Sequence, residues 1–190
     1  MTAPRDVLDF WFGPPDSPEY GAPRDMWFRK SEATDATIRA RFGGAVEAAL
    51  AGERRGWANG PRDALALVLM LDQFTRNIFR DTPRAFAGDE QALQVASEVV
   101  DRGADRLLIP VERWFIYLPF EHAESLSVQD ESLRLFGQLA AEGHQDALAW
   151  AQKHHDVIAR FGRFPHRNRI LGRTSSAEEL AFLAQPGSRF

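Results

Sequence analysis

The sequence predicts an all-helical protein, and three observations support this. Apolar side chains recur every three to four residues, which is the spacing of one buried helix face. Glycines follow such stripes where helices commonly end, and no segment shows strand alternation between hairpin turns. The two clearest stripes are Ile38, Phe42, Ala45, Val46 and Ala49, followed by Gly52, and Ala92, Leu93, Ala96, Val99 and Val100, followed by Gly103.

A longer helix is expected from Pro61 to Phe79, since proline is favoured in the first turn of a helix. Its first half, Ala64–Leu71, is apolar all round, as in a helix buried at the centre of a domain. Capping and stop signals predict three further helices: one from Ser127 and Asp130 to Gly143, one over 145–161 followed by Gly162, and a short one opened by Ser176 and Glu179.

Length and composition indicate one soluble domain covering residues 1–190. The net charge of −4 argues against a nucleic-acid partner. The longest apolar run is far shorter than the roughly 20 residues of a membrane span, so no membrane partner is expected. The absence of cysteine excludes disulfides and agrees with a reducing compartment, and the start of the chain does not resemble a signal peptide. We therefore expect a cytoplasmic protein.

The first polar cluster lies in the second half of the helix expected over 61–79. At about 100° per residue, Asp72, Arg76 and Arg80 continue an apolar stripe of that helix, and Asn77 lies beside them. One interpretation is a helix end emerging into water, with Asp72 and Arg76 as an i,i+4 ion pair. The other is a polar pocket in which the arginines bind a carboxylate or phosphate.

The second polar cluster comprises Glu121, His122 and Glu124, directly after the apolar run that ends at Pro119. Proline within a helix removes a hydrogen bond and kinks or ends it. A carboxylate beside a histidine can orient the imidazole, transfer protons or bind a metal. Alternatively, the two glutamates pair with the basic segment 153–173, which contains six Lys or Arg residues and one acid.

The third polar cluster combines His154 with the loop residues Arg163, His166, Arg167 and Asn168. On a helical wheel His154 falls at the centre of an apolar face, so we expect it to be buried, neutral and hydrogen-bonded. The loop after the helix gathers guanidinium and imidazole donors within six residues. Such a loop is able to hold an anion.

Three functions are compatible with these clusters: a pocket for a small anionic ligand, a scaffold for a peptide or protein partner, and a metal-dependent enzyme. Because a buried guanidinium needs a carboxylate partner, we expect the clusters to share one cavity, with Glu121 or Glu124 paired to Arg76 or Arg80. The anion pocket is favoured, and His122 and His166 are its acid–base candidates. The predicted ligand-binding residues are Asp72, Arg76, Asn77, Arg80, Glu121, His122, Glu124, Arg163, His166, Arg167 and Asn168.

No standard catalytic or nucleotide-binding motif is present, so the sequence specifies neither a reaction nor a cofactor. Glu121, His122, Glu124 and His154 are of residue types that can ligate a divalent metal, but their spacing is not diagnostic of a metal site. No metal ligands are therefore assigned.

The three clusters resemble the signatures of a bacterial family catalogued as domain of unknown function 924. The resemblance rests on Leu71–Arg80, Leu118–Glu124 and Arg160–Asn168, together with Val7–Gly13 and the Trp27-Phe28 pair. Thr75 stands where proline is usual in the family, and Ala123 stands where serine is usual. The resemblance implies a tetratricopeptide-like fold of antiparallel helix pairs in a right-handed superhelix. It carries no established activity.

Overall fold

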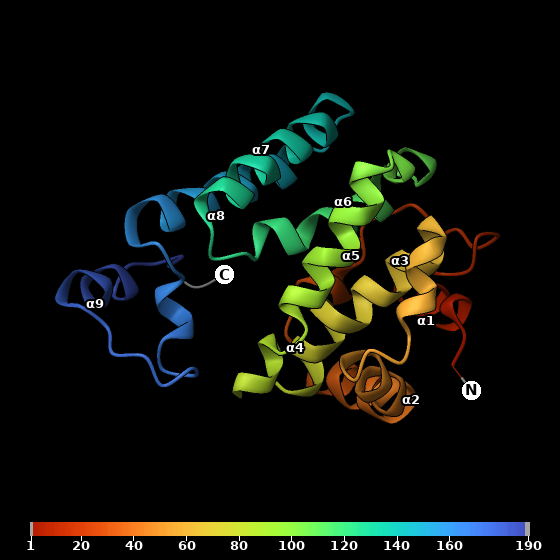
Figure 1. Ribbon diagram of the computed structural model, residues 1–190, viewed down its shortest axis with the longest axis horizontal. Coiled ribbons are helices and arrows are strands. Elements are labelled where there is room, and N and C mark those ends of the chain that lie inside the picture. The colour runs from red at the N-terminus through yellow and green to blue at the C-terminus, as the bar shows by residue number, and fades with distance from the viewer. Residues whose placement is uncertain (1, 189–190) are drawn as a thin grey trace. The chain divides into compact units, whose positions relative to one another are not determined.

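The computed structural model describes residues 2–188, and within this range every regular element is helical. Short 3-10 turns occupy several connections. The prediction of a helical protein without a sheet is confirmed for the described residues. The α-helices are α1 (Pro4–Phe12), α2 (Glu32–Leu50), α3 (Pro61–Val68), α4 (Thr75–Ile78), α5 (Asp89–Asp101), α6 (Pro110–Glu121), α7 (Leu126–Ala141), α8 (Gln145–Phe161) and α9 (Ala177–Leu183) (Figure 1).

Contacts divide the chain into two compact units. Unit 1 consists of the residues up to Arg80 together with Arg84–Pro119, and unit 2 consists of Asp81–Pro83 together with the residues from Phe120 onward. The single domain expected from the sequence stays a prediction. Among the described residues, no helix is long and apolar enough to cross a membrane.

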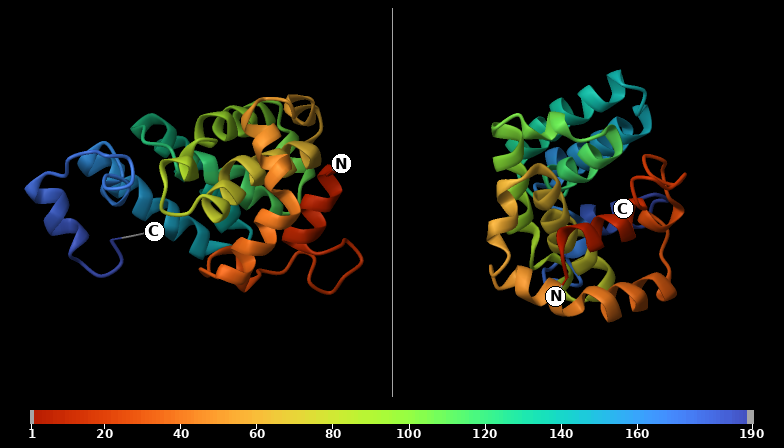
Figure 2. Two further views of the ribbon diagram at one scale, coloured as in Figure 1. Left: turned by 90° about the horizontal axis from the view of Figure 1, so that it is seen from below. Right: turned by 90° about the vertical axis from the view of Figure 1, so that its right-hand side faces the viewer.

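Unit 1 is built around one continuous helix from Pro61 to Ile78, in which a π-helical segment, Leu69–Phe74, joins α3 to α4. Helices α1, α2 and α5 pack against it (Figures 1 and 2). Its apolar half is almost fully buried, as the sequence predicts. Aromatic rings fill the space between these helices: Trp11, Phe12, Phe42, Phe74 and Phe115 are each no more than 2% exposed.

The π-helical segment lies where the first polar cluster begins. A wider helical turn disturbs the regular i→i−4 pairing, and such segments occur often at functional sites. Here a buried hydroxyl contributes to the local pairing, because Thr75 Oγ1 donates to the carbonyl oxygen of Leu71 at 2.8 Å and contacts that of Asp72 at 3.1 Å.

We therefore expect Thr75→Val to lower the free energy of unfolding by about 1–2 kcal/mol, since it leaves a buried carbonyl without this donor. Thr37→Val is the matched control, because the Thr37 hydroxyl makes the same i→i−4 bond to the Ala33 carbonyl at an exposed position. It should change stability by less than about 0.5 kcal/mol. Urea titrations of both variants measure the difference, and equal losses would contradict the role assigned to Thr75.

Unit 2 contains an antiparallel pair, α7 and α8, joined by three residues and packed along their length (Figures 1 and 2). The predicted bounds of α8 are confirmed, including its end at Gly162, whose φ of 68° suits glycine. The capping box of Ser176 and Glu179 at the start of α9 is confirmed as well. The capping box predicted at Ser127 is wrong, because α7 already begins at Leu126 and Ser127 lies inside it.

Pro119 lies inside α6, which ends only two residues later, at Glu121. The end of this helix is stabilised by a side chain that the sequence analysis did not single out. Gln129 is fully buried, and its Nε2 donates to the carbonyl oxygens of Glu121 at 2.7 Å and Ala123 at 2.8 Å. One amide thus supplies donors to carbonyls left without helical partners.

Candidate functional site

The first polar cluster is a buried network of ion pairs inside unit 1. Arg76 Nη1 lies 3.1 Å from Asp72 Oδ1 and 2.8 Å from Asp89 Oδ1, while its Nη2 lies 3.1 Å from Asp89 Oδ2. Gln73 Nε2 donates to Asp72 Oδ2 at 2.6 Å. The i,i+4 pair of Asp72 and Arg76 is confirmed, but Asp72 is 0% exposed, so this is not a helix end emerging into water.

Arg80 and Asn77 belong to a second pairing in the same unit. Both donate to Asp35, in the first turn of α2: Arg80 Nε to Oδ2 at 2.8 Å, Arg80 Nη2 to Oδ1 at 2.8 Å, and Asn77 Nδ2 to Oδ1 at 2.7 Å. Burial raises the pKa of Asp35, but the bonds from Arg80 and Asn77 outweigh it and hold the pKa below its ordinary value.

Inside unit 1, the carboxylates that pair with Arg76 and Arg80 are Asp72, Asp89 and Asp35. The reason is geometric: Asp35 and Asp89 are brought to the arginines by the packing of α2 and α5 against the central helix. The pairing with Glu121 or Glu124 that the sequence analysis expected stays a prediction. A cavity shared by all three clusters stays a prediction.

Glu124, of the second cluster, connects to the loop that follows α8. It accepts bonds from Arg173 Nη1 at 2.6 Å and Nη2 at 2.9 Å, and from the backbone N–H of Phe164 at 2.7 Å. Burial raises the pKa of Glu124, but these donors outweigh it and lower the pKa overall. Pairing with the basic C-terminal segment, one of the two interpretations, is thus confirmed for Glu124.

Arg163 and Asn168, of the third cluster, hold the C-terminal segment in place. Arg163 Nε lies 2.7 Å from Glu179 Oε1, at the capping box of α9. Asn168, only 1% exposed, donates to Ser175 Oγ at 3.0 Å and accepts from Arg173 Nε at 2.9 Å. These contacts account for a structural role of both residues.

Five other polar residues of the second and third clusters form a group in unit 2 that we call the histidine cluster. They are Glu121, His122, His154, His166 and Arg167. His154 Nδ1 lies 3.1 Å from Glu121 Oε1 and 2.9 Å from the carbonyl oxygen of Trp150. The His122 and His154 ring centroids are 6.2 Å apart. Arg167 is 6% exposed and donates to the carbonyl oxygen of His122 at 3.0 Å.

Phe164 connects the rings of this cluster. Its centroid lies 5.5 Å from that of His154 and 5.7 Å from that of His166, and the Arg167 guanidinium lies 4.6 Å above its face. His122 and His166 are half-buried, whereas His154 and Glu121 are buried. The cluster therefore has a buried interior formed by His154 and Glu121, and His122 and His166 are partly exposed.

His154 has the properties that the sequence analysis predicts for it: it is buried, hydrogen-bonded and neutral. Burial lowers its pKa to about 3, and the nearby positive groups of His122, Arg167 and His166 lower the pKa further against the opposing bond to Trp150. Its 3.1 Å contact with Glu121 is accordingly made by a neutral imidazole and is not an ion pair.

We expect the His154 imidazole to remain unprotonated at about pH 5, because protonation places a charge in a buried, positively charged environment. The folded pKa lies below the unfolded value of about 6.5. Stability from this residue is therefore present above pH 6.5 and is lost as the pH falls toward 3. A ¹⁵N NMR titration measures it, with His144, N-terminal to α8, as the comparison; a His154 midpoint near 6.5 would refute the assignment.

Across residues 2–188, no three His, Cys, Asp or Glu side chains are grouped so that they could hold a metal ion together.

The sequence matches a family described as "Bacterial protein of unknown function (DUF924)" over residues 7–187. The chain belongs to the DUF924 family. It is also similar to a solved structure titled "Structure of Protein of Unknown Function ATU0120 from Agrobacterium tumefaciens", with 40% sequence identity and a TM-score of 0.85. That match covers 95% of this chain and 96% of the other. A comparison with curated proteins gives no significant match.

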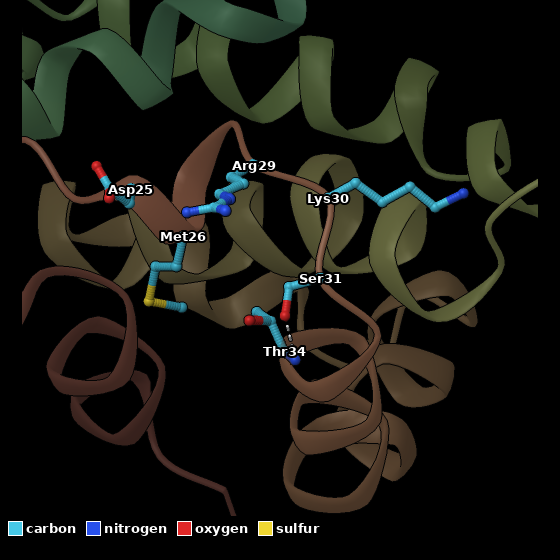
Figure 3. A pocket seen from close by; sticks show the side chains of 6 residues that line it. All are labelled: Asp25, Met26, Arg29, Lys30, Ser31 and Thr34. Atoms are coloured by element: carbon cyan, nitrogen blue, oxygen red, sulfur yellow. Dashed lines mark hydrogen bonds between the residues drawn. The ribbon is translucent and has the colours of Figure 1, made fainter.

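An open pocket in unit 1 of this DUF924 protein escaped the sequence analysis. It has a volume of about 360 Å³ and lies where the loop after α1 enters α2, lined by Asp25, Met26, Arg29, Lys30, Ser31 and Thr34. Figure 3 shows the Lys30 side chain extending away from the other five. The Ser31 hydroxyl is already used, because it caps α2 by accepting from the Thr34 N–H at 3.2 Å. The sequence analysis missed this pocket because single basic residues in a loop, such as Arg29 and Lys30, produce no periodic pattern.

Proposed function

We propose that this DUF924 protein binds a small anionic ligand at the histidine cluster of unit 2. The observation that supports the proposal is the grouping of one buried guanidinium, that of Arg167, with the half-buried imidazoles of His122 and His166. Buried guanidinium and imidazole groups bind carboxylates and phosphates strongly, because the low dielectric of the interior strengthens each charged hydrogen bond.

Two other arginines of unit 2, Arg163 and Arg173, have a structural role in this proposal. Arg163 pairs with Glu179 and Arg173 pairs with Glu124, so both hold the loop and α9 in place. Arg167 is buried, lies above the Phe164 ring and donates to the carbonyl oxygen of His122. We assign Arg167 as the fixed cation of the site.

His122 and His166 are the proposed acid–base groups if the ligand is a substrate. Both are half-buried and lie at the edge of the cluster, whereas His154 is held neutral in its interior. A group that reaches solvent can exchange protons with it, and a residue whose pKa lies far below neutrality cannot act as an efficient base at pH 7.

Binding of sulfate and of small dicarboxylates, measured by calorimetry near pH 6, tests this function. We expect His166→Gln to weaken binding about tenfold while the protein stays folded, and Arg167→Gln to abolish it. Arg160→Gln is the matched control, because Arg160 is an exposed arginine of the same unit that pairs with Glu178. Unchanged affinity in His166→Gln and Arg167→Gln, or an equal loss in the control, would overturn the assignment.

A second candidate function is a scaffold for a peptide or protein partner, on a tetratricopeptide-like arrangement of helix pairs. Two observations favour it: α7 and α8 form an antiparallel pair, and unit 1 exposes an aromatic side chain beside the open pocket. Phe28 is 61% exposed, although its ring lies 6.2 Å from Phe115 in a stacked geometry. Large exposed aromatic groups often anchor partners.

An acidic, aromatic-containing peptide library is a direct test of the scaffold function. Bound peptides should lose affinity in Phe28→Ser but not in Leu107→Ser, which alters an apolar side chain of the same unit that is even more exposed, at 77%. Binding that is independent of Phe28 would count against it.

A further inference from the structure

The three asparagines of the protein differ in how well their side-chain amides are protected. Asn59, in unit 1, is exposed, and among residues 2–188 no group forms a hydrogen bond with its side chain. Asn77 Nδ2 donates to Asp35 at 2.7 Å. Asn168 is only 1% exposed, and both atoms of its amide are bonded. Of the three amides, that of Asn59 is thus the accessible one.

The backbone nitrogen of the next residue, Gly60, is accessible as well. Gly60 lies between the 3-10 turn Arg55–Asn59 and α3, in an extended conformation with φ −110° and ψ 144°. Within the described part of the chain, its N–H donates to no acceptor. A Cβ atom at this position would meet only Asp63 Oδ2, at 3.9 Å. The nitrogen is therefore neither held by a hydrogen bond nor shielded by a side chain.

We propose that Asn59 and Gly60 form a site of spontaneous deamidation in the folded protein. Asparagine is a thermolabile residue, and here the Gly60 nitrogen attacks the side-chain carbonyl carbon of Asn59. A bond forms between these two atoms, the bond from that carbon to Nδ2 breaks, and ammonia leaves with the proton of the Gly60 N–H. Water then opens the resulting five-membered imide at one of its two carbonyl groups. The products are aspartate and isoaspartate, and in isoaspartate the main chain runs through the side-chain carbon.

The contacts on either side of Asn59 determine what each product does to the fold. Ala58 is buried, and its carbonyl oxygen accepts from Arg102 Nη2 at 2.8 Å. The Gly60 carbonyl oxygen accepts from the N–H of Ala64 at 2.8 Å, at the start of α3. Isoaspartate adds one carbon atom to the main chain between these two fixed carbonyl groups, so it disturbs the start of the central helix. Aspartate leaves the main chain unchanged, and its negative charge is favourable near the start of a helix.

Peptide mapping by mass spectrometry tests the proposal on the intact folded protein, kept under mildly alkaline conditions that favour loss of the attacking nitrogen's proton. We expect Asn59 to deamidate at least about tenfold faster than Asn77 and Asn168, because it alone combines a free amide with a following glycine, which has no Cβ atom to hinder attack. The chain unfolded in urea is the reference. Equal rates at the three asparagines in the folded protein, or reaction of Asn59 only in the unfolded chain, would overturn the proposal.

Gly60→Ala tests the assigned nucleophile. Alanine fits the negative φ and the open surroundings of residue 60, so the variant should fold. Its Cβ atom should slow deamidation of Asn59 at least about tenfold, because it hinders approach of the neighbouring nitrogen. Gly44→Ala, at an equally open position of the same unit, should leave the rate unchanged. Reaction of Gly60→Ala at the rate of the parent protein would show that Gly60 does not make the attack.

Asn59→Asp separates the effects of the two products. This variant carries the aspartate product alone and should melt at the temperature of the fresh protein or slightly above it. Aged protein that contains isoaspartate, counted by enzymatic methylation of its free α-carboxylate, should melt about 2–4 °C lower. Aged protein that contains isoaspartate but melts like Asn59→Asp would show that the added carbon atom does not disturb the start of α3.

Discussion

Gly88→Ala is expected to destabilise the protein by about 3 kcal/mol, and thus to lower the melting temperature by roughly 6–12 °C. Gly88 precedes α5 and lies directly against the central helix of unit 1. A Cβ atom at this position would lie 2.2 Å from the carbonyl oxygen of Leu71, 2.9 Å from its carbonyl carbon and 3.0 Å from its Cα. All three are backbone atoms, so no side-chain rotation relieves the clash.

The close approach has a structural reason. Leu71 lies in the π-helical segment of the central helix. Asp89, the residue after Gly88, pairs with Arg76, which lies further along that central helix. An added methyl group would force the start of α5 away from the ion pair. The effect should therefore include a loss of the Asp72–Arg76–Asp89 network.

Gly44→Ala is the matched control, because Gly44 lies in α2 of the same unit and an added Cβ meets nothing within 4 Å. Alanine is the better helix former, so this variant should gain about 0.5–1 kcal/mol. Urea denaturation of the two variants provides the comparison. A Gly88→Ala protein of native stability would show that the contact with Leu71 is not as close as described.

Arg76→Met should lower the free energy of unfolding by about 3–5 kcal/mol, because it leaves the fully buried Asp72 without its cation. The guanidinium bridges two carboxylates and also donates to the Asp72 carbonyl oxygen at 2.7 Å. Its pKa is raised: burial opposes the charge, but the two aspartates outweigh burial. Asp72→Asn in the same background should restore part of the loss, since it removes the uncompensated buried charge.

The control for this prediction is Arg84→Met. Arg84 pairs with Glu47 at 2.7 Å in the same unit, but both side chains are more than half exposed. Exposed ion pairs contribute about 0–1 kcal/mol. If the two arginine variants lose equal stability, or if Asp72→Asn restores nothing, then burial of Asp72 does not explain the effect.

Both predictions concern the helix over 61–79, in which the sequence places charged residues on a stripe that begins as apolar. An apolar stripe that turns into Asp72, Arg76 and Arg80 means either exposure or a buried polar network, and periodicity cannot distinguish the two. The structure resolves it, because Asp72 is completely buried. The deciding factor is Asp89, at the start of α5, which pairs with Arg76 and which the sequence analysis did not single out.

Local signals predicted several elements correctly. The bounds of α8, its end at Gly162, the capping box of α9 and the burial of His154 all follow from residues within one or two helical turns of each other. Helix α1 was not predicted from the sequence, because nine residues rich in aromatic groups contain too few turns to establish a period.

The three motifs identified the family, but they did not distinguish structural residues from ligand-binding ones. Leu71–Arg80, Leu118–Glu124 and Arg160–Asn168 identified the family correctly. Much of their polar content is occupied by structural contacts, such as Arg163 with Glu179 and Asn168 with Ser175. A motif shows which residues occur together, but it does not show which of them hold the fold and which are left to bind a ligand.

The sequence by itself determined that this protein is helical, where its strongest helices begin and end, and which family it belongs to. These properties depend on periodicity and capping, which act over a few residues of the chain. Only the tertiary structure decided the partners of the charged side chains: Asp35 for Arg80, 45 residues away, and Arg173 for Glu124, 49 residues away. The physical reason is that ion pairing depends on distances in space, and these are set by helix packing, which places residues far apart in the chain within hydrogen-bond reach.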